Sequence, residues 1–131
     1  MSGYVLDDLA LIAGLTTDGE EHHRRELSRL LTAAIDRGPT IAVPALCLAT
    51  AAVRRPAIAD HLAELVTGGP PGAIKIIGLA RTAEVTQLRT EHPGISWPAL
   101  HATSTATAGR VPVVTTDPGR YASTVVEAIR L

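Results

Sequence analysis

The residues YVLDDLALIAGL (residues 4–15) decide the fold. Tyr4-Val5-Leu6 predicts a short strand that breaks at Asp7, and the apolar run at residues 9–15 predicts a short helix or turn packed behind it. A strand that leads directly into a helical segment is typical of α/β proteins, in which such units alternate along the chain. The fold of the whole chain therefore depends on whether this alternation continues.

The alternation does continue. Further strands are predicted at residues 40–43, 73–77 and 111–115, and helices at residues 19–37, 45–54, 56–66, 80–90 and 96–108. The helix at 19–37 has an apolar stripe at helical spacing, Asp18 as a cap and Gly38-Pro39 as a stop. Residues 67–72 (TGGPPG) predict a loop, and Ser96 and Gly109 the two ends of a later helix. The final run, residues 124–129, is compatible with an edge strand or a last helix.

These strands are apolar without strict alternation, which is typical of parallel strands buried beneath helices on both faces. The pattern predicts a single three-layer α/β/α domain of Rossmann-like type, spanning residues 1–131, with a central, mainly parallel sheet of four to five strands. In open sheets of this kind ligands bind beyond the carboxyl ends of the strands. Asp7 and Asp117 follow two predicted strands, so both are expected at that edge.

Composition narrows the possible functions. The chain has 131 residues, a net charge of −1 and 2% aromatic residues, so neither a global attraction to nucleic acid nor a platform of stacking aromatics is predicted. Cys47 is the only cysteine, which excludes an internal disulfide and fits a reducing compartment. The first residues have no basic leader and are too short an apolar run to span a bilayer, so we expect a cytoplasmic protein without a membrane partner.

Asp7 and Asp117 are the candidate metal ligands and catalytic residues. Two carboxylates at one sheet edge repel each other unless a hard cation such as Mg²⁺ or Mn²⁺ offsets their charge. Such a metal activates water and stabilises the charge of a phosphodiester transition state. The structural alternative is a helix-capping aspartate at residue 7 and a turn aspartate at residue 117, which are both common for local reasons.

Three stretches, YVLDDLALIAGL, VPALCLATAAV and WPALHATSTATAGRVPVVTTDPGRYA, resemble the PIN-domain family in order and approximate spacing, and are most similar to the small bacterial toxins of the VapC type. The resemblance covers nearly the whole chain. It implies a PIN-like fold, a Mg²⁺- or Mn²⁺-dependent endoribonuclease activity, a homodimer, RNA or single-stranded DNA as substrate, and an antitoxin-like or regulatory protein as partner.

Carried over residue by residue, the resemblance assigns only half of the family's acidic centre. Asp7 matches the first aspartate and Asp117 matches the acidic residue that closes the fourth strand. Thr50 and Pro98 stand where the family has a glutamate and an aspartate. Thr50 retains a hydroxyl for a metal-bound water, whereas proline offers no side-chain ligand. Since the affinity for hard cations depends on the number of charged ligands, any Mg²⁺ or Mn²⁺ site is expected to be weak.

Four further residues are predicted near this centre. His101 follows Pro98 by about one helical turn and is a candidate proton carrier, with a packed helix histidine as the alternative. Thr116 and Arg120, together with Thr50, are candidate contacts for substrate phosphates. Asp8 is predicted to be a solvated, helix-capping residue, since neighbouring side chains diverge on regular secondary structure; it would share an ion with Asp7 only if the backbone turned there.

The sequence excludes several other functions. It contains no G-x-G-x-x-G after a strand and no P-loop, and the aspartate and lysine that a phospho-accepting receiver domain needs are missing from the middle and late strands. The remaining hypotheses are three: a weak or inactive relative of toxin-type ribonucleases, an active nuclease that uses Asp7 and Asp117 with non-standard helpers, and a non-catalytic module that binds RNA or protein.

Overall fold

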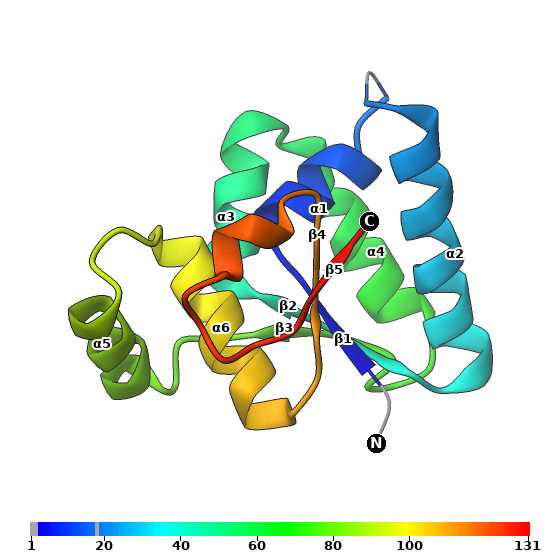
Figure 1. The fold of residues 1–131 in the computed structure, drawn as a ribbon. Coiled ribbons are helices and arrows are strands. Elements are labelled where there is room, and N and C mark those ends of the chain that lie inside the picture. Colours follow the sequence, from blue (N-terminus) through cyan, green and yellow to red (C-terminus); the bar gives the residue numbers. More distant parts are fainter. Residues whose placement is uncertain (1–2, 18) are drawn as a thin grey trace.

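The protein is described by a computed structural model that covers residues 3–17 and 19–131. Asp18, the predicted cap of the second helix, lies outside the described residues. A sheet of five strands forms the centre of the molecule (Figure 1). The strands are β1 (Gly3–Leu6), β2 (Thr40–Pro44), β3 (Ile74–Ile77), β4 (Val113–Thr115) and β5 (Ala128–Arg130).

All four pairs of neighbouring strands are parallel, in the order β3-β2-β1-β4-β5, which confirms the predicted sheet. Only the end of the last predicted run, residues 124–129, becomes an edge strand, because β5 begins at Ala128, and no helix forms there. Strand β1 lies in the centre, and its residue Leu6 pairs with Val114 of β4. The carboxyl ends of β1 and β4 are therefore neighbours, and the residues that follow them are brought together.

The helices are α1 (Asp8–Gly14), α2 (Glu21–Arg37), α3 (Ala45–Arg54), α4 (Ala57–Gly68), α5 (Thr82–Glu91) and α6 (Trp97–Gly109), with a short 3-10 helix, η1 (Pro118–Tyr121). Helix α6 covers one face of β1 and β2, whereas α2 and α4 pack against β2 and β3 from the opposite side (Figure 1). The architecture is the three-layer α/β/α arrangement that the sequence predicts.

Two predicted helix ends are wrong. Helix α4 includes Thr67 and Gly68, so the loop predicted at residues 67–72 begins two residues later; the Thr67 hydroxyl donates to the Ala63 carbonyl at 3.0 Å and extends the last turn. Gly109 is still helical, and the left-handed residue that ends α6 is Arg110, with φ of 54°. The chain therefore uses a non-glycine residue at a position that favours glycine.

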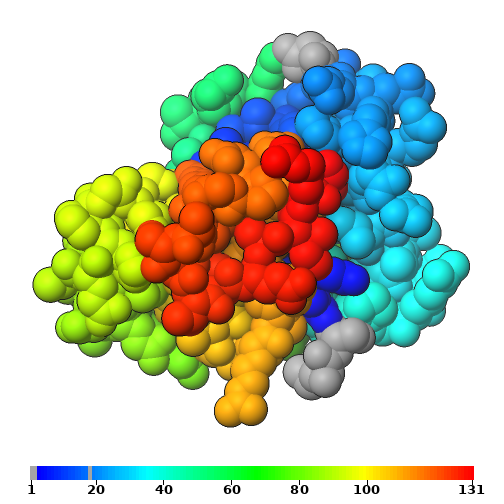
Figure 2. Space-filling model, in the orientation of Figure 1, coloured from blue at the N-terminus to red at the C-terminus, as the bar shows by residue number. Residues whose placement is uncertain are grey.

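The core lies between the sheet and the helices on both of its faces, and it takes buried side chains from β1 to β4 and from α1, α2, α3, α4 and α6. Gly14 marks the closest approach of α1 to α2, because a Cβ there would lie 2.2 Å from Cδ2 of Leu27. In the space-filling view the C-terminal segment packs across the helices at the front of the molecule (Figure 2). This segment carries the residues that complete the candidate site.

Candidate functional site

Asp7 lies at the carboxyl end of β1 and is the N-cap of α1. Its backbone is extended, and Oδ1 accepts a hydrogen bond of 2.9 Å from the Ala10 amide, which satisfies a free donor of the first helical turn. Its other oxygen, Oδ2, accepts from the Tyr121 hydroxyl at 2.7 Å and from Nη1 of Arg120 at 3.1 Å. The side chain is fully buried, so both oxygens are bonded within the protein.

Asp8 is the first residue of α1 and shares Arg120 with Asp7. Nη1 of Arg120 lies 2.6 Å from Oδ1 of Asp8 and Nη2 lies 3.2 Å from Oδ2, a bidentate pair. The prediction that Asp8 is solvated is wrong, since its side chain is only 6% exposed. The reason is local: the backbone is extended at Asp7 and helical at Asp8, so this bend lets one cation reach both carboxylates.

Arg120 reaches this position because of the turn after β4. The chain leaves β4 at Thr115, whose hydroxyl accepts from the Asp117 amide at 3.2 Å, and enters η1. The Arg120 amide donates to the Asp117 carbonyl at 3.1 Å, which directs the side chain back toward α1. Nη2 also donates to Oγ of Ser96 at 2.8 Å, so the guanidinium joins α1, η1 and the start of α6.

The electrostatics favour an ionised Arg120 between the two aspartates. Burial alone would lower the pKa of Arg120, but its bonds to Asp8 and the charges around it raise this pKa above its ordinary value. Burial raises the pKa of Asp7, and the Asp8 charge adds to that effect, while the Ala10 amide and the Tyr121 and Thr115 hydroxyls oppose it. Burial and the nearby Asp7 also raise the pKa of Tyr121, which remains a neutral donor.

The other acidic candidate, Asp117, lies differently. Its side chain is exposed and makes no hydrogen bond or ion pair within the described residues, while its backbone forms the start of η1. Thr116 contributes its carbonyl, which accepts from Nη1 of Arg130 on β5 at 3.1 Å. The structure therefore gathers Asp7, Asp8 and Arg120 in one buried cluster and leaves Asp117 beside it on the surface.

Thr50 and His101 make mainly structural contacts. The Thr50 hydroxyl donates to the Leu46 carbonyl at 2.7 Å, although the residue also lines a groove together with Asp8 and Arg120. His101 is buried; Nδ1 accepts from the Leu46 amide at 3.3 Å and Nε2 lies 3.3 Å from the Gly78 carbonyl. This arrangement assigns the proton to Nε2, and burial lowers the pKa of His101. Neither nitrogen is left for proton transfer at the acidic cluster.

An open groove of about 500 Å³ lies above the cluster, and some of the residues that line it were not predicted from the sequence. Its polar and aromatic lining consists of Asp8, Thr50, Arg89, Ser96, Trp97 and Arg120. Trp97 is 49% exposed, and the guanidinium carbon of Arg89 lies 4.3 Å from its ring centroid, a cation–π contact. The single tryptophan at the start of a helix was the available signal, but only the fold brings Arg89 over it.

A metal ion does not fit the cluster while Arg120 is in place. Every oxygen of Asp7 and Asp8 accepts a hydrogen bond, and the charged guanidinium occupies the position where a cation would neutralise both carboxylates. Within residues 3–17 and 19–131, no group of three or more His, Cys, Asp or Glu side chains is placed to hold a metal ion. Arg120 is the counter-ion of the centre, and its contact with a substrate stays a prediction.

The fold of this chain is similar to that of several solved structures. It is similar to a chain of the VapBC2 complex of Rickettsia felis bound to a DNA fragment from its promoter, with a TM-score of 0.67, 17% identity, and 98% of both chains covered. The likeness is one of fold. A chain of FitAB bound to the IR36 DNA fragment gives a TM-score of 0.64 and 17% identity, covering 97% of this chain and 94% of that one. A chain of a toxin–antitoxin complex from Klebsiella pneumoniae gives a TM-score of 0.65 and 15% identity, covering 97% of this chain and 96% of that one.

No family model and no curated protein matches the sequence. The likeness therefore rests on the arrangement of helices and strands, and extends over nearly the whole chain. Among the described residues, no helix is long and apolar enough to cross a membrane.

Proposed function

We propose that this protein is a PIN-like relative of toxin-type ribonucleases whose acidic centre is partly neutralised by its own arginine, so that it binds RNA without cleaving it efficiently. The observation that carries the proposal is the placement of Arg120 between Asp7 and Asp8. A guanidinium supplies positive charge, but it cannot activate a water molecule as a metal ion does. Mg²⁺ and Mn²⁺ are accordingly expected to bind weakly.

The groove above the cluster supports RNA as the ligand. Trp97 offers an exposed ring for a base, and Arg89, beside that ring, offers positive charge for phosphates. The groove lies at the carboxyl edge of a parallel sheet, the usual place of ligands in such folds. An antitoxin-like protein as partner, and a homodimer, are proposals that follow from the fold shared with chains of toxin–antitoxin complexes.

A combined cleavage and binding assay tests this function. Purified protein is incubated with labelled structured RNA and with single-stranded DNA, in Mg²⁺, in Mn²⁺ and in chelator, beside an Asp7→Asn, Asp117→Asn double variant. The expected result is no cleavage above that of the double variant, together with RNA binding that the chelator does not change. Binding is followed by fluorescence anisotropy.

Trp97→Ala and Arg89→Met locate the binding. Loss of stacking on one base is expected to weaken RNA binding by about tenfold. Arg25→Met is the matched control, since Arg25 is an exposed cation on α2 that does not line the groove. Equal binding by all three variants and the wild type would remove the groove from the proposal.

The second candidate is an active metal-dependent nuclease that uses Asp7 and Asp117. It is favoured by the carboxylate of Asp117, which is exposed, has no partner among the described residues, and lies three positions before Arg120. Metal-dependent cleavage that disappears in the double variant would establish this candidate and overturn the proposal of a neutralised centre.

A further inference from the structure

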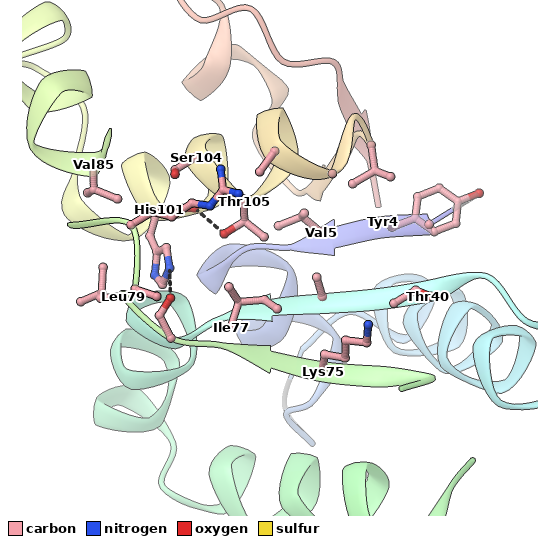
Figure 3. Close-up of a pocket in the computed structure, with 18 residues that line it drawn as sticks. Tyr4, Val5, Thr40, Lys75, Ile77, Leu79, Val85, His101, Ser104 and Thr105 are labelled. Atoms are coloured by element: carbon pink, nitrogen blue, oxygen red, sulfur yellow. Dashed lines mark hydrogen bonds between the residues drawn. The ribbon is translucent and has the colours of Figure 1, made fainter. Parts of the chain in front are cut away.

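A second cavity, separate from the groove above the acidic cluster, lies between α6 and the face of the sheet that this helix covers. On this face Val5, Ala42 and Lys75 are neighbours on the three adjacent strands β1, β2 and β3. Figure 3 shows Val5 and Lys75 beneath α6, and His101, Ser104 and Thr105 of this helix also line the space. The cavity has a volume of about 360 Å³.

The cavity exists because small residues face one another. Strands β1 and β2 present Gly3, Thr40 and Ala42, and the last turns of α6 present Thr105 and Ala108. Helix α6 packs on β1 and β2, whereas β3 is the edge strand, so one side of the cavity stays open. Its volume falls in the range of pockets that bind small molecules, roughly 300–1,000 Å³.

The two ends of the cavity differ in polarity. Leu79, Val85 and Ile77 form an apolar end beside His101, and Lys75 and Thr40 lie at the opposite end (Figure 3). Apolar atoms make up most of the lining. A ligand that fits is thus apolar over most of its length and polar at one end.

Lys75 determines the charge of that polar end. It is the only lysine of the chain, and it has no hydrogen bond or ion pair with any residue in the described ranges. Arg81, the other charged residue of the cavity lining, is already paired with Glu84 at 3.2 Å, and the Ser104 hydroxyl donates to the same carboxylate. One positive charge remains without a partner at the cavity.

We propose that this cavity binds a small apolar carboxylate, an alkyl or aryl acid whose charged group meets Lys75 and whose hydrocarbon part packs against Ile77, Leu79 and Val85. Charge complementarity and the apolar lining both select such a molecule over a neutral polar one. The site lies on a face of the sheet, not at its carboxyl edge, and it does not depend on the activity proposed above.

Octanoate and 1-octanol, which differ mainly in the head group, are the probes. Each is titrated into the full chain, and binding is followed by NMR chemical-shift changes. Octanoate is expected to shift residues of β2, β3 and α6 and to bind about tenfold more tightly than octanol. Lys75→Met keeps the apolar stem and is expected to remove this difference.

Ala42→Leu fills the cavity from the sheet, and Ala108→Leu fills it from the exposed end of α6. Two variants are used so that the test remains possible if one of them does not fold. Each is expected to abolish binding of both probes. Arg37→Met, on α2, is the matched control and leaves binding unchanged. The proposal is overturned if octanoate does not bind at millimolar concentration, or if Lys75→Met binds it as the wild type does. It is also overturned if sedimentation shows a dimer that Ala108→Leu dissociates, because a second copy of the chain would then fill the cavity.

Discussion

Replacing Arg120 by methionine removes the guanidinium from the acidic cluster while it keeps most of the side chain's length. In the wild type Arg120 lies 3.1 Å from Asp7, 2.6 and 3.2 Å from the two oxygens of Asp8, and 2.8 Å from Ser96. Asp7 is fully buried and Asp8 nearly so. The variant therefore leaves two buried carboxylates without a counter-ion.

The expected loss of unfolding free energy is about 3–5 kcal/mol, the usual range for removing one partner of a buried ion pair. For a domain of this size the loss corresponds to a decrease in Tm of roughly 10–20 °C. Arg120 is only 17% exposed, so solvent screening reduces this value little. Urea denaturation followed by circular dichroism measures the change.

Arg29→Met is the matched control. Arg29 pairs with Glu26 at 2.6 Å, as short a contact as that of Arg120 with Asp8, but its side chain is 76% exposed. An exposed pair contributes about 0–1 kcal/mol, so this variant is expected to unfold almost as the wild type does. Adding Asp8→Asn to the Arg120→Met variant should restore part of the lost stability. A loss below about 1 kcal/mol in Arg120→Met would refute the assignment of Arg120 as the counter-ion.

Three further variants test the surroundings of the cluster and the packing of α1. Tyr121→Phe removes the 2.7 Å bond to Asp7 and is expected to lower the unfolding free energy by about 1.5–3 kcal/mol; an unchanged urea midpoint would contradict this. For Asp7→Asn the expectation concerns pH. Because burial holds the pKa of Asp7 above its ordinary value of 3.8, the unfolded chain ionises first, and the wild type loses stability relative to the variant as the pH rises through the acid range. Thermal unfolding at a series of pH values checks the sign, and a wild type that gains stability relative to the variant as the pH rises would contradict it. Gly14→Ala places a Cβ against Leu27 and is expected to cost about 1–3 kcal/mol, whereas Gly68→Ala, which meets no atom within 4 Å, should be neutral or stabilising; equal effects in calorimetry would show that α1 and α2 are not tightly packed.

The sequence predicted the elements whose signals are local. Apolar runs and helix caps placed four of the five strands, and Ser96 is the N-cap of α6, as expected from its position before the helix. Asp7 at the carboxyl end of β1 was also predicted, since both the strand and the following helix are encoded within a few residues. The helix-capping role considered for Asp7 is the one that the structure adopts, alongside its contact with Arg120.

The ion pairs between Arg120 and the two aspartates were not predictable from local sequence patterns. Arg120 and Asp8 are 112 positions apart, and their contact requires both the adjacency of β1 and β4 and the tight turn of η1. Asp7 and Asp117 were expected to converge because both follow strands. Yet the turn that directs Arg120 inward leaves the Asp117 side chain exposed. Adjacent strands bring the residues that follow them to the same edge of the sheet. The backbone of the turn after each strand then decides which side chain points inward.

A crystal of the wild-type protein grown in Mn²⁺ and measured near the manganese absorption edge would test the central claim most directly. With the Arg120 guanidinium between Asp7 and Asp8, the account predicts no anomalous peak at these carboxylates and an Arg120 side chain within hydrogen-bond distance of both. A manganese peak bound to Asp7, with Arg120 displaced from the cluster, would contradict the account and favour the metal-dependent nuclease.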